Sequence, residues 1–272
     1  DNITYIYGMG TPFEKTALRG VSLTIENGEF LGVIGHTGSG KSTFVQHLNG
    51  LLHPTTGTVT VNGVDISAST EEAKKMRHKV GMVFQYPEHQ LFEETIAQDI
   101  AFGPKNLGLS ADDVDERVRD AMKFVGLDYD TYAERSPFHL SGGQMRRVAI
   151  AGVVAMDPDF LVLDEPSAGL DPFGREEIFE EIIRLHKEKG ITVILVSHNM
   201  EDISRMASRL VVLDKGRIVL DGEPMDIFNN HRDELQAVGV DVPPVSVTME
   251  YLREQGLDVS NRVLSVDLSL IH

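Results

Sequence analysis

The chain has 272 residues, contains no cysteine and carries a formal net charge of −17 at pH 7. The missing cysteines exclude a disulfide scaffold and a cysteine-based metal site. The acidic balance, without a local basic patch, argues against nucleic acid or an anionic lipid surface as the partner, and no apolar run approaches the length of a membrane span.

The first segments predict an antiparallel β layer. Residues 3–7 and 17–25 alternate apolar and polar side chains, as half-buried strands do, and the stretch 8–12 between them has the composition of a loop. Tyr7 and Phe13 border this loop, where an aromatic ring either stacks on an adenine or packs against the protein itself. Both roles stay open, and we keep Tyr7 as a candidate nucleotide contact.

Residues 35–43 read Gly-His-Thr-Gly-Ser-Gly-Lys-Ser-Thr and fit the phosphate-binding loop pattern. An apolar, strand-like run at 30–34 precedes them and a helical pattern begins at Ser42, which is the context that this loop requires. The glycines let backbone N–H groups surround a phosphate, and the helix adds its positive end. Lys41 is placed to reach the outer phosphates, and the Ser42 hydroxyl is placed to ligate Mg²⁺. The candidate nucleotide contacts are Gly35, His36, Thr37, Gly38, Ser39, Gly40, Lys41, Ser42 and Thr43.

The next part of the chain is predicted to become helical. Residues 57–63 end in Asn-Gly and form a strong hairpin signal, and residues 80–84 indicate a buried strand that ends at Gln85. From 86 to about 156 the pattern changes to helices and connecting loops, which we interpret as a helical subdomain.

Two helix starts in this region are marked by serine. Residues 111–125 have helical periodicity, with Ser110 as their N-cap. Another helix is expected to start at Ser141, in the sequence Leu-Ser-Gly-Gly-Gln, and to run to about Met156. A Ser-Gly-Gly helix start offers backbone N–H groups and the helix dipole to an anion, although the same residues also serve as a plain N-cap.

Two later strands end in polar side chains. The apolar run 160–163 ends in Asp164 and Glu165, and the run 192–196 is soon followed by His198. Because the carboxyl ends of parallel strands face the ligand, Asp164 suits the Mg²⁺ shell, and Glu165 is placed to orient or deprotonate a water that attacks the γ-phosphate. Capping of the next helix is the alternative for both acids. His198 is predicted to contact the γ-phosphate, and the other nine histidines are interpreted as surface or packing residues.

This ordered set of motifs resembles an ATP-binding-cassette ATPase, and the resemblance spans about residues 5–223. It implies ATP and Mg²⁺ as ligands. The catalytic residues that it implies are Gln85, Glu165 and His198, and the implied metal contacts are Ser42, Gln85 and Asp164. In that family two cassettes close head to tail, so that the Leu-Ser-Gly-Gly-Gln helix of one caps the ATP of the other. The residues that match this cap are Ser141, Gly142 and Gly143.

Five segments narrow the resemblance to the ATPase subunits of energy-coupling factor transporters, which take up vitamins or transition-metal ions. These segments are residues 10–18, 84–96, 101–109, 164–172 and 197–202. The match is closest to the second ATPase of the two-ATPase type. It implies a peripheral protein on the cytoplasmic face of the cell membrane that hydrolyses ATP to drive import. Selectivity lies in another subunit of such transporters, so the sequence does not identify the transported micronutrient.

The resemblance also implies partners. A second ATPase subunit is expected, with a related heterodimer partner favoured over a second copy of the chain. A transmembrane energy-coupling subunit is expected to dock near the acidic segment from Glu88 to Glu94, where Leu91 and Phe92 indicate an apolar floor for an arginine-bearing helix. A solvated helix face is the alternative for these acids. Substrate-binding membrane subunits are indirect partners, and no nucleic acid is expected.

The remaining chain predicts a short strand at 217–220 and helices at about 223–228, 232–238 and 248–255. This tail is similar to the C-terminal helical extension of the energy-coupling factor ATPases, which supports pairing of the two ATPases. A helical cap on the core is the alternative.

The predicted fold is α/β: a phosphate-loop NTPase of ATP-binding-cassette type, with a parallel core sheet, an antiparallel β layer, a helical subdomain and a small C-terminal helical extension. We assign residues 1–230 to the cassette, with the helical subdomain inserted at about 86–156, and residues 231–267 to the extension. Residues 268–272 read Leu-Ser-Leu-Ile-His, as the start of a common sequencing adapter would when translated, so we expect them to be an artefact. The chain also begins without Met inside a strand-like segment, so we expect preceding residues to be missing.

Two other classes of function are compatible with a phosphate loop. A soluble cassette ATPase acting on DNA or ribosomes typically has long coiled-coil insertions, paired cassettes or basic surfaces, and the sequence contains none of these. A nucleotide-binding regulator without turnover would not need Glu165.

Overall fold

The computed structural model describes residues 1–257, so the expected artefact at 268–272 lies outside the described residues. The chain forms two compact units. Of the described residues, unit 1 comprises 1–59 and 194–257, and unit 2 comprises 60–193. Within residues 1–257, every helix is too short or too polar to traverse a bilayer.

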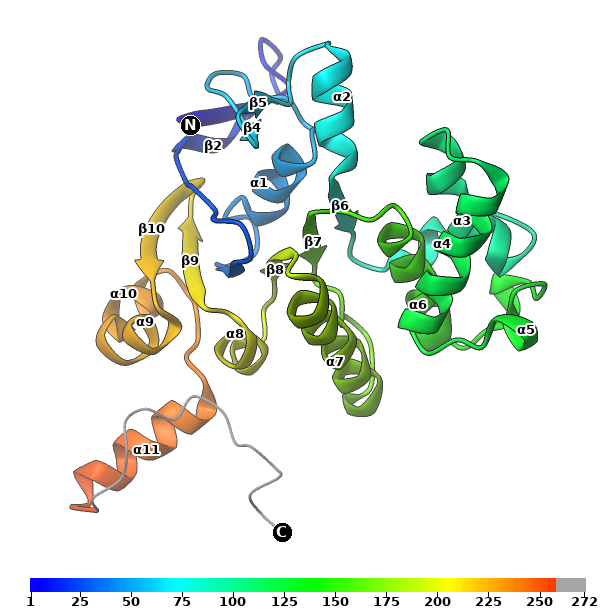
Figure 1. Ribbon diagram of the computed structural model, residues 1–272. Helices are drawn as coiled ribbons and strands as arrows, with labels where there is room; N and C mark the ends of the chain where they lie inside the picture. The colour runs from blue at the N-terminus through cyan, green and yellow to red at the C-terminus, as the bar shows by residue number, and fades with distance from the viewer. Residues whose placement is uncertain (258–272) are drawn as a thin grey trace. The chain divides into compact units, whose positions relative to one another are not determined.

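Unit 1 contains a parallel strand pair and an antiparallel layer (Figure 1). Its strands are β1 (Ile3–Tyr7), β2 (Lys15–Val21), β3 (Phe30–Ile34), β9 (Arg209–Asp214) and β10 (Arg217–Gly222). Strand β3 lies parallel to β9, and β9 pairs antiparallel with β10. All five residues of β3 are buried, as is typical of a parallel strand covered on both faces.

The predicted antiparallel layer is present as the pair β1 and β2. The second strand was expected at 17–25, but it begins at Lys15 and ends at Val21. Its end follows from pairing, because Val21 lies opposite Ile3, the first residue of β1, and the chain beyond has no partner strand in this ladder.

The helices of unit 1 follow the phosphate loop, pack beside β3 and form the tail. They are α1 (Lys41–Leu48), α8 (Met200–Met206), α9 (Pro224–Asn230), α10 (Arg232–Ala237) and α11 (Pro244–Glu254). All three predicted tail helices are present. The last begins at Pro244 instead of 248, because proline is well suited to the first position of a helix.

Unit 2 contains a hairpin, a second parallel strand pair and most of the helices. Its strands are β4 (Thr60–Val61), β5 (Val64–Asp65), β6 (Val80–Val83) and β7 (Phe160–Asp164). Its helices are α2 (Glu71–His78), η1 (Pro87–Gln90), α3 (Ile96–Asn106), α4 (Ala111–Phe124), α5 (Tyr129–Tyr132), η2 (Pro137–His139), α6 (Gly142–Val154) and α7 (Pro172–Lys189). Strand β8 (Thr192–Val196) crosses the division between the units.

Local sequence signals explain where a hairpin turn and a helix of unit 2 begin. The hairpin β4–β5 turns through Asn62 and Gly63, whose φ angles of 49° and 80° are those of the turn that Asn-Gly favours. Helix α4 begins where predicted, with the Ser110 hydroxyl accepting the Asp113 N–H at 3.2 Å.

The polar residues of unit 2 are positioned by β6, β7 and the helices beside them. The two strands are parallel, with Val83 opposite Leu163. Helices α3, α4 and α6 pack on one another (green in Figure 1), and their buried side chains include Ile100, Met122 and Ile150. Parallel strand pairs in both units confirm the predicted α/β class with a parallel core.

Candidate functional site

The phosphate loop connects β3 to α1 in unit 1, and two of its positions admit only glycine. Gly35 has a φ of +151°, and a Cβ atom there would lie 2.3 Å from the Leu213 carbonyl oxygen. Gly40 has a φ of +108°, and its Cβ atom would lie 2.8 Å from the Ala17 carbonyl oxygen. Such approaches are too close for any side chain. The loop therefore follows the tight path by which a phosphate loop turns its N–H groups inward.

The turn between β9 and β10 braces this loop. The imidazole Nε2 of His36 lies 2.9 Å from a carboxylate oxygen of Asp214, and the Ser39 carbonyl accepts the Gly216 N–H at 2.8 Å. The sequence motif includes His36 and Ser39 but gives no signal for Asp214 or Gly216, because this turn is remote in the chain. Residues outside the phosphate-loop motif therefore help to hold the loop in place.

A cavity of about 580 Å³ opens beside the loop, and its lining is basic. Lys41 contributes to it from the start of α1, and its Nζ donates to the carbonyl oxygens of Gly35 at 2.6 Å and His36 at 3.1 Å. The charged residues of the lining are Lys15, Arg19, Lys41, Lys215 and Glu14. Because the four basic residues come from three separate segments, the sequence shows no basic patch. A pocket of this charge and size, in a chain of net charge −17, suits a small polyanion.

Tyr7 lies at this cavity and Phe13 does not. The Tyr7 hydroxyl is 3.1 Å from the Thr43 hydroxyl, and its half-exposed ring belongs to the lining. The ring of Phe13 is 86% exposed. The adenine contact predicted for Tyr7 is therefore compatible with its place beside the loop, and it stays a prediction.

His47, on the helix that follows the loop, is fully buried and edge-on to the Tyr5 ring. Its Nδ1 lies 2.7 Å from the Thr43 carbonyl oxygen. Since a carbonyl only accepts, Nδ1 carries the hydrogen. Nε2 has no hydrogen-bond partner in the described part of the chain. Burial lowers the pKa of His47, and the hydrogen bond to Thr43 opposes this only in part.

This burial predicts that acid destabilises the protein through His47. The unfolded chain takes up a proton at His47 below about pH 6.5, whereas the folded chain resists it. The stabilisation is therefore complete above about pH 6.5 and is lost as the pH falls below it, by at most about 1.4 kcal/mol per pH unit. Thermal unfolding between pH 7.5 and 5.5 measures it. The His47→Asn variant should lose less stability than the wild type, and the exposed control His139→Asn should match the wild type. Equal slopes for His47→Asn and wild type would contradict the assignment.

In unit 2, the predicted polar residues follow neighbouring strand ends. Because Val83 lies opposite Leu163 in the parallel pair, Gln85 and Glu165 follow at the same edge. Asp164 is buried, Glu165 is half-buried and Gln85 is exposed. Glu165 has a φ of 52°, a left-handed conformation that costs a non-glycine residue on the order of 1–3 kcal/mol. Backbone strain of this kind is concentrated at functional sites.

Ser141 begins α6 as predicted and forms a complete capping box. Its hydroxyl accepts the Gln144 N–H at 3.3 Å, and the Gln144 side chain accepts the Ser141 N–H at 3.1 Å. Gly142 and Gly143 have space where a Cβ atom would be, since nothing apart from their chain neighbours and the backbone of α6 lies within 4 Å of that position. Packing within this chain therefore gives no reason for two glycines here. They leave the first-turn backbone open to a ligand or a partner.

The last two residues of interest are His198 and Arg146. His198 is exposed, lies in unit 1 two residues beyond the end of β8, and precedes Asn199, the N-cap of α8. Arg146, which the sequence motifs do not single out, is buried in α6 and binds Glu88 together with backbone carbonyls that follow Glu165. No sequence signal identifies Arg146, because its partners are defined only by the fold.

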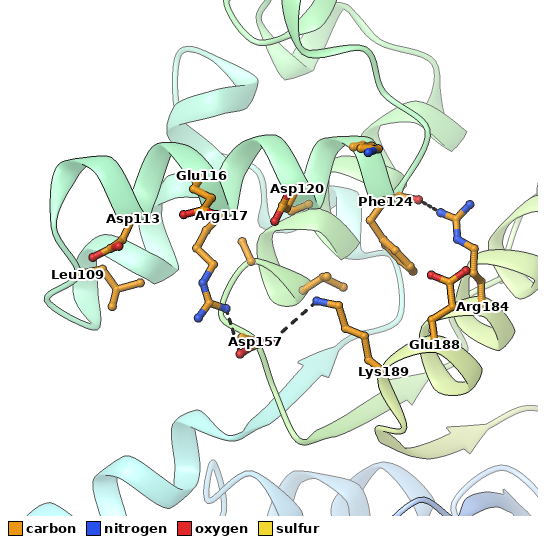
Figure 2. Close-up of a pocket in the computed structure, with 14 residues that line it drawn as sticks. Leu109, Asp113, Glu116, Arg117, Asp120, Phe124, Asp157, Arg184, Glu188 and Lys189 are labelled. Carbon is orange, nitrogen blue, oxygen red and sulfur yellow. Dashed lines mark hydrogen bonds and ion pairs between the residues drawn. The ribbon is translucent and has the colours of Figure 1, made fainter.

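A second cavity, of about 860 Å³, lies between α4 and α7 in unit 2 (Figure 2). Side chains of both charges line it, and several are paired: Asp157 binds Arg117 at 3.2 Å and Lys189 at 3.8 Å. None of the residues that the sequence singled out belongs to this lining. Its mixed and partly paired charges favour no one class of ligand.

Comparisons with known proteins define the class. The family model described as ABC transporter matches residues 18–168. The structure of cbiO1 from Clostridium perfringens, described as part of the ABC transporter complex cbiONQ, has a TM-score of 0.76 at 36% identity, over 92% of this chain and 97% of that one. A dimeric structure of MJ0796, a bacterial ABC transporter cassette, has a TM-score of 0.73 at 30% identity, over 82% of this chain and 97% of that one. These matches define an ABC transporter cassette.

Sequence relatives narrow the class. The energy-coupling factor transporter ATP-binding protein EcfA2 of Clostridium tetani is 54% identical over 267 residues, which is 98% of this chain and 92% of the relative. The protein of the same name from Bacillus cereus is 51% identical over 271 residues, covering 97% of this chain and 91% of the relative. The chain belongs to this family of energy-coupling factor ATP-binding proteins within the ABC transporters. It is an ATPase whose hydrolysis of ATP is coupled to transport.

Proposed function

We propose that this chain is the second ATPase of a two-ATPase energy-coupling factor importer. It binds MgATP at a head-to-tail interface with a related ATPase and drives uptake of a micronutrient, a vitamin or a transition-metal ion, through a transmembrane partner. The observation that carries the proposal is the cavity beside the phosphate loop, where four basic side chains and one acidic one gather in an acidic chain. The name of the relatives supports the coupling to transport.

Mg²⁺ is the proposed metal, and the chemistry of each proposed donor suits it. The Ser42 hydroxyl lies in the first turn of α1, and Asp164 and Gln85 lie at the ends of β7 and β6. These are oxygen donors, which Mg²⁺ prefers, and it usually takes only one or two carboxylates beside phosphate oxygens and water. Residues 1–257 accordingly need no cluster of three His, Cys, Asp or Glu side chains, and they contain none.

The proposed roles follow from phosphoryl transfer, which needs an aligned water and neutralised charge and no covalent intermediate. Lys41 binds the outer phosphates and His198 the γ-phosphate. Glu165 orients or deprotonates the attacking water, with Gln85 beside it. When bound, Mg²⁺ would neutralise negative charge on the phosphates.

The proposed partner ATPase completes each site with its Ser-Gly-Gly turn. The open space over Gly142 and Gly143 supports this, because an approaching phosphate meets only backbone there. A dimeric form of the similar cassette MJ0796 supports pairing of two cassettes. A related second ATPase is proposed rather than a second copy.

The transmembrane subunit is proposed to dock on an aromatic and acidic surface made of Phe92, Glu93, Glu94 and Phe102. The two phenylalanine side chains are 57% and 46% exposed and pack edge to face, with ring centroids 4.9 Å apart. Two neighbours expected to contribute are turned elsewhere: Leu91 is buried, and Glu88 binds Arg146. The docking surface is therefore centred after Glu88, and it suits an amphipathic helix bearing arginine. Through it the chain would lie on the cytoplasmic face of the membrane.

Charge reversal at Glu93 and Glu94 tests this proposal. The double variant Glu93→Lys, Glu94→Lys should abolish capture by the transmembrane subunit, because the acidic rim becomes repulsive to arginine. ATP binding should be unchanged, since neither residue lines the cavity beside the loop. The measurement is a pull-down in detergent with the transmembrane subunit, followed by transport in vesicles.

The matched control is Glu71→Lys, Glu72→Lys, which reverses two adjacent exposed glutamates in the first turn of α2 in the same unit. This control should be captured like the wild type. Full capture and transport by the Glu93, Glu94 variant would place the docking site elsewhere.

A further inference from the structure

Arg146 is the largest fully buried side chain of the described chain, with 2% of its surface exposed. Arginine is almost never buried unless it is paired. Here every guanidinium N–H has an acceptor. Nε and Nη2 donate to the Glu88 carboxylate at 3.1–3.2 Å. Nη1 donates to the carbonyl oxygens of Pro166 at 3.0 Å and Ala168 at 2.9 Å.

This Arg146 cluster joins three segments of unit 2. Arg146 itself belongs to α6, the helix that begins at Ser141. Glu88 belongs to η1, which follows Gln85. Pro166 and Ala168 belong to the turn directly after Glu165. One planar group with five donors thus fixes the relative positions of these segments.

The turn held by Arg146 is one that needs support. Glu165 occupies a left-handed conformation with φ 52°, and Tyr86, which follows Gln85, has a φ of 57°. Strained residues persist where the surrounding structure holds them. Arg146 binds carbonyls one and three residues beyond Glu165. The Tyr86 ring also comes close to Gly169, 3.8 Å from where a Cβ atom would lie, so the same two segments approach each other at a second place.

We infer that Arg146 is a positioning residue for ATP hydrolysis: it holds the turn that carries Glu165 and ties that turn to the segment leading from Gln85 to the docking surface. The inference rests on the proposed role of Glu165 in activating water. It goes beyond that role because Arg146 binds the two backbone carbonyls that follow Glu165 and acts through them. A bidentate Arg–carboxylate pair is directional, so a displacement at the docking surface is felt at the turn after Glu165.

The principal test is the double variant Arg146→Met, Glu88→Leu. Removing one partner of a buried pair leaves an unpaired charge, but replacing both by apolar residues of similar volume is often neutral or stabilising. The double variant should therefore fold, with a melting temperature lowered only by the loss of the donor to the Pro166 and Ala168 carbonyls, and it should bind ATP within about twofold of the wild-type affinity. Its kcat in the assembled transporter should fall by about 10- to 100-fold, because small misplacement of a catalytic group costs this much. KM for ATP should change little.

Arg146→Lys is the second variant, and it keeps the charge that Glu88 requires. Lysine has three donors and no planar fork, so it cannot hold the carboxylate and both carbonyls together. Its kcat should also fall, by about tenfold. The control is Arg117→Met, which removes another Arg–carboxylate pair of unit 2, Arg117 with Asp157 (Figure 2), and should leave kcat unchanged.

The outcomes separate positioning from mere stability. A lower kcat in a variant that is folded at the assay temperature and keeps its ATP affinity supports the inference. Wild-type kcat in a folded double variant, or in Arg146→Lys, overturns it. Wild-type turnover by Glu165→Gln would instead overturn the proposed role of Glu165. That measurement does not depend on the Arg146 variants, so the two failures can be told apart.

Discussion

Replacement of Glu165 by Gln should lower ATP turnover of the assembled transporter by about 100-fold or more, while ATP still binds. The amide has nearly the shape of the carboxylate but cannot accept a proton from water. Asp164, the buried neighbour proposed for the metal, is untouched by the change. The measurement pairs steady-state hydrolysis with equilibrium binding of ATP to the same preparation, so that a loss of kcat is separated from a loss of affinity.

Two controls make this result specific. Asp159→Asn removes an exposed carboxylate just before β7, at the strand end opposite Glu165, where it binds Lys79, and it should hydrolyse ATP like the wild type. Lys41→Ala should fail at the earlier step and weaken ATP binding itself, because its ammonium lies over the loop. Wild-type turnover by Glu165→Gln in the assembled complex would mean that another group orients or deprotonates the attacking water.

The two units carry different parts of this chemistry. Unit 1 contains the phosphate loop, the basic cavity and His198, all of which suit binding of an anion. Unit 2 contains Gln85, Glu165 and the Ser-Gly-Gly turn, which suit action on water and contact with a partner. Variants of unit 1 are therefore expected to act mainly on affinity for ATP, and variants of unit 2 mainly on turnover and assembly.

Sequence periodicity was sufficient for elements whose signals are local. The Asn62-Gly63 hairpin, the Ser110 and Ser141 helix starts and the buried strand 192–196 depend on neighbouring residues alone, and the structure contains all four. Element ends were less certain where pairing decides them. Strand β2 stops at Val21 because its partner begins at Ile3, and no pattern within 17–25 reports that.

The site was predictable where a motif is contiguous and not where it is assembled by the fold. Residues 35–40 form one loop and residues 41–43 open α1, so the contiguous motif connects a strand to a helix as expected. The His36–Asp214 contact joins residues 178 positions apart, and the Arg146–Glu88 pair joins residues 58 positions apart. The sequence predicts Glu88 as one of the acids of the docking segment, because a single sequence shows the charged residues but not the residues with which they pair. In the fold, Glu88 pairs with the buried Arg146, so its carboxylate is held inside unit 2.

Replacement of Ser141 by Arg should damage hydrolysis at the site on the opposing ATPase while leaving ATP binding to this chain intact. A long cation over Gly142 blocks the open backbone that the proposed partner's ATP needs, and loss of transition-state donors of this kind costs about 100-fold or more. The measurement is photolabelling with an ATP analogue, which reports the nucleotide bound to each subunit, together with the ATPase rate of the assembled pair. Labelling of this chain should persist in Ser141→Arg and disappear in Lys41→Ala.

Ser110→Arg is the matched control for this variant. Ser110 and Ser141 are both N-cap serines of unit 2 whose hydroxyls accept a backbone N–H three residues on, at 3.2 and 3.3 Å. Either substitution removes a cap worth about 1 kcal/mol, so the two variants should lose similar stability. Only Ser141→Arg should lose hydrolysis, because only α6 begins with two glycines whose surroundings are open. Equal rates for both variants, or full activity from a strictly monomeric preparation at high dilution, would show that the Ser-Gly-Gly turn does not act on a neighbouring site.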